Sequence, residues 1–237
     1  PLGGKQVTAI VPLGQSDRWI ATLDGLYRHR DGALQAVVPG QGAAATRIRC
    51  LLPRGAESLW LCTEDGVRVL HDGALTRPEW AAPFDGAFAT RMIALADGRV
   101  LIGTLDAGLG VLRDGRLQRL GRAEGLPSLN AWAMDPVDDW LYVGSLDGIW
   151  RVRIDSLPDP GAAAGAGGPL VAEVVAGSGY RERSIRGFAC CNGGAMSRSA
   201  RLGRFLFYPS TEGVVRLDTA AVDTRPEPPP ALVEALH

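Results

Sequence analysis

Short apolar runs separated by tight-turn signals follow one another along this chain of 237 residues. Residues 48–77 illustrate the pattern, because their apolar positions predict strands at 48–52, 59–63, 66–70 and 74–77. Asp72-Gly73 separates the last two of these strands, and Asp-Gly between apolar runs indicates a hairpin, since both residues tolerate a positive φ. The pattern therefore predicts four short antiparallel strands joined by tight turns.

This unit recurs along the chain. Each copy has an apolar pair, a small residue, a Thr or Ser, an acidic residue, a glycine and a further apolar run. The copies lie at Trp19–Tyr27, Trp60–Val67, Leu101–Gly108, Tyr142–Ile149 and Phe205–Val214. Their turn glycines are spaced by 41, 42, 40 and 65 residues. A period of about 40 residues built from strands is typical of a propeller blade. The predicted fold class is therefore all-β, a β-propeller of four-stranded antiparallel blades, with about five blades in this chain.

The repeat also predicts where each blade is packed. We expect the first strand of each blade to be innermost and the second strands to lie near 18–22, 59–63, 100–104, 140–145 and 204–208. Small residues recur in these second strands, where a large side chain between facing blades would overpack; they are Ala21, Cys62, Gly103 and Gly144. Trp19, Trp60 and Tyr142 stand two residues earlier and are interpreted as inter-blade core.

Two segments break the period and set the domain boundaries. The extra residues near 155–169 predict a surface insertion before an outer strand at 170–175. After 213–217 no fourth strand is evident, so the propeller region is assigned to residues 1–225 and is expected to be partial. Residues 226–237 predict a proline-rich linker and the start of another domain. Because an open propeller exposes sheet edges, missing blades are expected to come either from the rest of the parent chain or from another copy or fragment.

The charge and the apolar runs exclude some partners. The net charge of −1 gives no electrostatic basis for binding nucleic acid. No apolar run approaches the roughly 20 residues that span a bilayer as a helix.

Acidic residues and glycines occupy the repeated turns. A ring of acids at a propeller axis could bind a cation, but the favoured interpretation is structural: an acid that precedes a turn glycine caps the local backbone. The residues concerned are Asp24, Gly25, Asp65, Gly66, Asp106, Gly108, Asp147, Gly148, Glu212 and Gly213.

Other candidate chemistry is sparse. Asp135, Asp138 and Asp139 are placed in one turn but lack the alternating ligands of a calcium loop. His29 and His71 have no third ligand at metal spacing. No nucleophile and base stand in a recognisable pattern. We therefore expect no metal, no cofactor and no catalysis by residues 1–237.

Four cysteines leave the redox state open. A hairpin centred near residue 56 places Cys50 opposite Cys62, close enough to bond in an oxidising compartment. The favoured interpretation is that Cys62 is a small buried filler, like the residues at its position in other copies. Cys190 and Cys191 could form a vicinal disulfide. The favoured interpretation is that they are neighbours on one strand whose side chains point to opposite faces, one of them inward.

The phrase at Trp19–Arg28 and its copies resembles the two-component regulator propeller repeat. Glu124–Asn130 is similar to the Gly-Leu-Pro phrase that precedes the inner strand in those repeats. Cys190–Ala195, with Pro209–Val215, resembles the last blade of membrane-bound diguanylate cyclases that carry such propellers. The prolines and Leu232–Glu234 resemble the entry to their immunoglobulin-like domain. The resemblance covers essentially the whole chain.

This resemblance implies a periplasmic sensor region of an inner-membrane protein with a cytoplasmic output domain, either a diguanylate cyclase or a hybrid histidine kinase. The implied partner is an unknown periplasmic ligand, such as a carbohydrate or another small molecule, and the parent is expected to act as a homodimer. The sequence holds no Gly-Gly-Asp/Glu-Glu-Phe motif of a cyclase. A propeller enzyme acting on polysaccharide and a protein-interaction scaffold remain alternatives, because fold alone does not fix function.

Overall fold

The computed structural model describes residues 2–39, 46–55, 58–146, 148–162, 168–175, 199–210 and 213–222. These residues form five antiparallel sheets, four with four strands and one with three, and in each sheet neighbouring strands follow the order of the chain. No helix in this part of the molecule is long and apolar enough to cross a membrane.

Each sheet is a meander of short strands. The first contains β1 (Val7–Pro12), β2 (Asp17–Thr22), β3 (Gly25–Arg30) and β4 (Ala33–Pro39). The second contains β5 (Ile48–Pro53), β6 (Ser58–Thr63), β7 (Gly66–His71) and β8 (Ala74–Thr76). The third contains β9 (Ala89–Ala94), β10 (Val100–Thr104), β11 (Leu109–Arg113) and β12 (Arg116–Leu120). The fourth contains β13 (Ala133–Val137), β14 (Trp140–Ser145), β15 (Gly148–Arg153) and β16 (Ala172–Val174), and the fifth β17 (Ala200–Leu202), β18 (Phe205–Ser210) and β19 (Gly213–Asp218). Of two 3₁₀ segments, η2 (Glu79–Phe84) connects the second sheet to the third, and η3 (Ile154–Ser156) follows β15 within the fourth sheet.

The predicted strands and hairpins are confirmed. All five second strands coincide with their predicted ranges to within two residues. In the Asp-Gly turns between third and fourth strands, both residues have positive φ, for example 48° at Asp72 and 77° at Gly73. Two consecutive residues with positive φ give the twist of a two-residue hairpin that matches the strands it joins.

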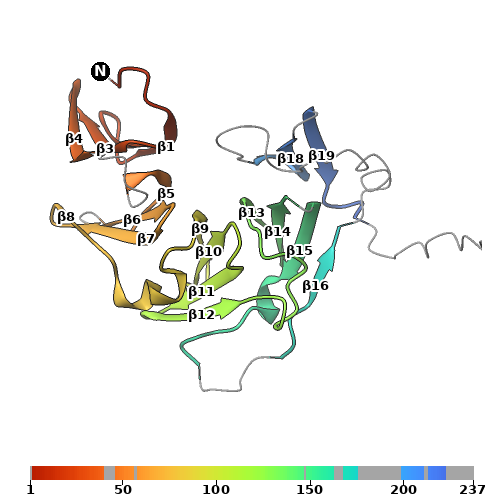
Figure 1. Ribbon diagram of the computed structural model, residues 1–237. Coiled ribbons are helices and arrows are strands. Elements are labelled where there is room, and N and C mark those ends of the chain that lie inside the picture. Colours follow the sequence, from red (N-terminus) through yellow and green to blue (C-terminus); the bar gives the residue numbers. More distant parts are fainter. Residues whose placement is uncertain are drawn as a thin grey trace, which may run out of the picture.

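The sheets follow one another around an open arc (Figure 1), as blades do in a propeller. The first strands β1, β5, β9 and β13 contact one another in sequence and line the inside of this arc. Apolar clusters fill the spaces between successive sheets. Trp60, whose ring centroid lies 4.8 Å from that of Trp80, packs against the cluster between the second and third sheets. Tyr142 is buried between the fourth and fifth, so the aromatic residues are core as predicted.

The breaks in the repeat have structural counterparts. The fifth sheet has three strands, and residues 219–222 form no fourth; residues 223–237, with the linker, lie outside the described residues. The insertion near 155–169 begins against the third sheet, where the Arg99 guanidinium donates to the carbonyls of Ile154 (2.8 Å) and Leu157 (2.7 Å). The outer strand after it, β16, is shorter than predicted.

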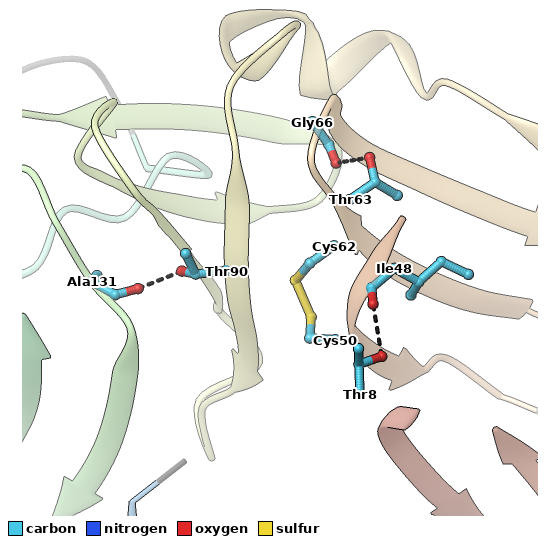
Figure 2. Close-up of a disulfide and its surroundings, with 8 residues drawn as sticks. All are labelled: Thr8, Ile48, Cys50, Cys62, Thr63, Gly66, Thr90 and Ala131. Atoms are coloured by element: carbon cyan, nitrogen blue, oxygen red, sulfur yellow. Dashed lines mark hydrogen bonds between the residues drawn. A yellow bond between two sulfur atoms is a disulfide. The ribbon is translucent and has the colours of Figure 1, made fainter. Parts of the chain in front are cut away.

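The preference for a buried Cys62 without a disulfide is wrong. Cys50 and Cys62 face each other across β5 and β6, with Cα atoms 4.8 Å apart, and form a disulfide (Figure 2). Both are buried, so Cys62 fills the position expected of a small residue and is also a cross-link. Cys190 and Cys191 lie outside the described residues.

Candidate functional site

The repeated turn between second and third strands is closed by a hydroxyl. In each sheet the Thr or Ser that ends the second strand donates to the carbonyl of the turn glycine, at 3.0 Å from Thr22, 2.8 Å from Thr63, 2.7 Å from Thr104, 2.8 Å from Ser145 and 3.1 Å from Ser210. The Thr63 hydroxyl also accepts the amide of Asp65 (3.2 Å). In these turns the hydroxyl that precedes the acid therefore caps the backbone, a role that was predicted for the acid (Figure 2 shows Thr63 and Gly66).

Two of the three described turn acids form separate ion pairs. Asp24 pairs with Lys5, Asp65 pairs with Arg68 and Arg77, and Asp106 is exposed. Asp147 and Glu212 lie outside the described residues. Among the residues described, no three His, Cys, Asp or Glu side chains are grouped so that they could hold a metal ion.

The turn glycines are required by the backbone. Gly25, Gly66, Gly108, Gly148 and Gly213 all have positive φ. At Gly66, with φ of 85°, an added Cβ would also stand 2.6 Å from the carbonyl oxygen of Phe84. The glycine therefore allows the segment that connects the second and third sheets to approach this turn closely.

Inner-strand side chains connect neighbouring sheets. Thr8 of β1 donates to the carbonyl of Ile48 (2.7 Å), and Thr90 of β9 donates to that of Ala131, both shown in Figure 2. The register gives Arg49 the same position in the second sheet. Its guanidinium instead pairs with Glu64 of the same sheet and lies 4.8 Å from the ring centroid of Phe88.

In the fourth sheet, Trp132 holds the position equivalent to Thr8, Arg49 and Thr90, just before β13. Its ring packs against Phe88, with the ring centroids 5.7 Å apart. Arg49, Phe88 and Trp132 are each half-buried. They form a row across the second, third and fourth sheets, which we call the inner row. A guanidinium beside aromatic faces can hold a polar molecule through hydrogen bonds and ring contacts.

A second group of side chains lies between the third, fourth and fifth sheets. Its members differ in chemistry from the residues at the same positions of other copies. Arg91 stands where the first two sheets have Ala9 and Cys50, and Asp135 where the second has Leu52. The Ser199 hydroxyl donates to Asp135 Oδ1 (2.7 Å), and the buried Tyr208 lies beside the same carboxyl. We call Arg91, Asp135, Ser199 and Tyr208 the polar junction.

Asp135 therefore differs from the prediction that placed it in one turn with Asp138 and Asp139. It lies in β13, whereas the other two form the turn that follows. His29 and His71 lie in hairpins of the first and second sheets, and His71 Nε2 is 3.4 Å from Asp72 Oδ2. Sequence reasoning missed the inner row and the roles of Arg91 and Tyr208. Their signal was a polar or aromatic residue at a position where other copies are small or apolar.

The phrase at 124–130 has a packing role. The Asn130 side chain donates to the carbonyl of Leu105 (2.9 Å) and accepts the amide of Leu146 (2.9 Å). These two residues belong to the repeated turns of the third and fourth sheets, so Asn130 joins the turns of neighbouring blades.

Comparison with known proteins shows the fold. No family model matches the chain, and neither does any curated protein sequence. A solved extracellular domain assigned to a hybrid two-component system of B. thetaiotaomicron, BT4673, is similar with a TM-score of 0.69 and 18% identity, over 94% of this chain and 27% of that one. A second such domain from that organism, BT3049, gives 0.55 and 13%, over 91% and 34%. Virginiamycin B lyase of Staphylococcus aureus gives 0.55 and 11%, over 90% and 70%.

These likenesses establish a β-propeller built of antiparallel blades. The chain spans roughly a quarter to a third of the two hybrid-system domains. At this level of identity the likeness concerns the fold and not the site.

Proposed function

We propose that this chain is part of the propeller in an extracytoplasmic sensor region of a transmembrane signalling protein. The observation that carries the proposal is the coincidence of the repeat with the fold of extracellular hybrid-system domains over 94% of the chain. The Cys50–Cys62 disulfide supports it, because structural disulfides persist mainly in oxidising compartments outside the cytoplasm. In this proposal a periplasmic domain of an inner-membrane homodimer binds a carbohydrate or another small molecule, and blades elsewhere in the parent chain complete the ring.

The output domain is a diguanylate cyclase or a hybrid histidine kinase in this proposal. The phrase that favours a cyclase, at residues 190–195, lies outside the described residues. We propose further that residues 1–237 bind without catalysing a reaction. Turnover of a glycan or nucleotide by this chain, abolished by a point substitution within it, would refute that part.

We place the proposed ligand contacts on the inner row, because it combines half-buried aromatic rings with the Arg49 guanidinium, which also pairs with Glu64, on the first strand β5. The test uses the full-length parent. Trp132→Ala should remove the response of its output to a carbohydrate and small-molecule panel, whereas Trp140→Ala, on the turn side of β14, should retain it. A parent whose propeller is cytoplasmic by protease accessibility in spheroplasts would overturn the proposal.

The signal is proposed to pass through the linker. Proline fixes φ and favours an extended path, so Pro228, Pro229 and Pro230 would make a stiff connector. A ligand shifts output only if it binds one arrangement of the paired sensors better than the other. Replacing these prolines with glycine should weaken the response while leaving ligand affinity nearly unchanged, as measured on the same full-length protein.

A further inference from the structure

The polar junction gathers groups from three sheets around one carboxyl. Asp135 comes from β13, Arg91 from β9 and Tyr208 from β18, and Ser199 immediately precedes β17. The Ser199 hydroxyl donates to Asp135 Oδ1 at 2.7 Å, and this bond joins the fourth sheet to the fifth. Tyr208 has no exposed surface, and Asp135 is half-buried. The carboxyl is therefore part of the contact between the two sheets.

The repeat shows that these polar groups are not needed to pack a junction. In the contact between the second and third sheets, Leu52 and Cys50 occupy the positions that Asp135 and Ala133 hold at the junction of the fourth and fifth sheets, and both belong to an apolar cluster. Burying an ionisable group costs free energy that an apolar side chain at the same position does not incur. Asp135 thus gives this junction a property that its counterparts lack.

Charged and titratable groups reach Asp135 from the elements packed around it. Arg91 on β9 and Arg201 on β17 favour the ionised carboxyl. Tyr142, paired with Asp135 across β13 and β14, accepts from Arg151 Nη1 (3.0 Å) on β15, which in turn pairs with Glu173 on β16. On the side of the fifth sheet are Tyr208 of β18 and the apolar Val215 and Leu217 of β19.

Burial dominates this balance. It raises the pKa of the Asp135 carboxyl above its ordinary value, against the opposing effects of Ser199, Tyr208 and the two arginines. Burial, and then the neighbouring Asp135, raise the pKa of Tyr208 well above its usual range, so this hydroxyl stays neutral. Because the Tyr208 hydroxyl stays neutral, Asp135 is the acidic group of the junction whose charge can change with pH.

We propose that the polar junction makes the attachment of the fifth sheet to the fourth depend on pH, with the tightest attachment when the Asp135 carboxyl carries a proton. The inference concerns the chain itself and stands whether or not the chain serves in signalling.

The direction follows from linkage. A carboxyl with a raised pKa in the closed junction keeps its proton over a range in which the open junction has lost it. Closing the junction then takes up a proton, so its stability falls as the pH rises through that range and is constant above it. Carboxyls whose pKa is lowered, such as Asp97 beside Arg99, act in the opposite direction, so a local measurement is needed.

The experiment is hydrogen–deuterium exchange on the 237-residue chain at about pH 5 and about pH 7.5, corrected for intrinsic exchange. Amides of β18 are compared with those of β6, in a junction without such a carboxyl. We expect β18 to open several-fold more often relative to β6 at the higher pH. Asp135→Leu and Asp135→Asn should remove this difference, and Asp138→Asn, exposed in the following turn, should keep it.

Equal opening at both pH values, or a pH difference that survives in both Asp135 variants, would overturn the proposal. A measurement on the unaltered chain covers the case in which the variants do not fold. In a carbon-13 titration of the aspartate carboxyls, the midpoint for Asp135 should lie above that of an unperturbed aspartate. A midpoint at or below it would equally contradict the proposal.

Discussion

At the scale of single residues, the repeated phrase is explained by its hydroxyl and its glycine. The Thr63 hydroxyl donates to the carbonyl of Gly66 and accepts the amide of Asp65, and it is fully buried. One side chain therefore satisfies two backbone groups of a tight turn. This accounts for the presence of Thr or Ser in all five copies, while the acid that follows forms different contacts in different copies.

Thr63→Val should destabilise the chain by about 1–3 kcal/mol, because it leaves two backbone groups of the turn without this partner. Thr76→Val is the matched control, since that hydroxyl lies on the exposed outer strand with a long contact of 3.4 Å to Val69. Urea unfolding followed by the fluorescence of Trp60 and Trp80 measures both. Equal midpoints for the two variants would show that the hydroxyl contributes little.

Glycine substitutions separate backbone strain from crowding. Gly66 and Gly73 have similar φ values, 85° and 77°. An added Cβ at Gly66 would stand 2.6 Å from the carbonyl oxygen of Phe84, whereas one at Gly73 would have no atom within 4 Å. Gly73→Ala should cost about 1 kcal/mol from its backbone conformation alone. Gly66→Ala should cost clearly more by the same unfolding assay. A smaller loss at Gly66 than at Gly73 would mean that η2 moves away without cost.

At the scale of the element, the second sheet shows what a disulfide adds to a blade. Cys50 and Cys62, which are 12 positions apart in the sequence, close a loop across the inner hairpin, within the apolar cluster shared with the third sheet. The cross-link restricts the unfolded chain, and a small residue at position 62 still fits between the sheets. The element thus carries a constraint that its equivalents do not.

Replacing both Cys50 and Cys62 by alanine should destabilise the chain by about 3 kcal/mol on the loop-entropy estimate. The midpoint of urea unfolding should fall, and a reducing agent should then have no further effect on the variant. Replacing Cys190 and Cys191 by alanine is the control, because it leaves the cross-link in place. Unaltered protein whose thiols all react with an alkylating agent after denaturation without reductant would contradict the disulfide.

Most of the element-level fold could be predicted from sequence, because strands and hairpins depend on local patterns. Asp72-Gly73 fixes its turn through the positive φ of two adjacent residues, and the alternation around Trp60 fixes a buried face. Cys62 could not be resolved in the same way, since smallness and cross-linking place the same demand on its position.

The candidate site was less predictable, because its side chains are brought together by contacts between sheets and not by local sequence patterns. Arg49, Arg91 and Asp135 stand out only when the copies are aligned by strand register, and their neighbours come from other sheets. The predicted turn acids were conspicuous in sequence, yet Asp24 and Asp65 form separate ion pairs and Asp106 is exposed.

At the scale of the whole molecule, the open arc leaves apolar residues on its terminal sheets. Ile10 of β1 is 56% exposed and alternates with Ala9 and Val11, which pack on the second sheet. Val214 of β19 is 70% exposed beside Val215, which packs on the fourth. In the sheets at the middle of the arc, the corresponding faces are covered by a neighbouring sheet. An isolated chain therefore exposes two apolar sheet faces, one at each end of the arc.

Sedimentation analysis should therefore show self-association of the isolated chain at high concentration. Combining Ile10→Lys with Val214→Lys should increase the monomer fraction, because charge on these faces opposes their burial. Val171→Lys, at a residue 47% exposed outside any strand, should leave the distribution unchanged. A chain that is monomeric throughout would indicate that the terminal faces do not associate.

The bonds from Thr8 to Ile48 and from Thr90 to Ala131 span 40 and 41 residues, which is one repeat. Every such bond therefore has its donor in one copy and its acceptor at a fixed place in the next. If a gene segment of this length is duplicated or lost, each remaining donor still meets an acceptor of the same kind. For these two bonds, gain or loss of a whole blade is then nearly neutral, whereas a deletion of part of a repeat breaks one. Blade number can therefore drift during evolution while the geometry of each junction is preserved.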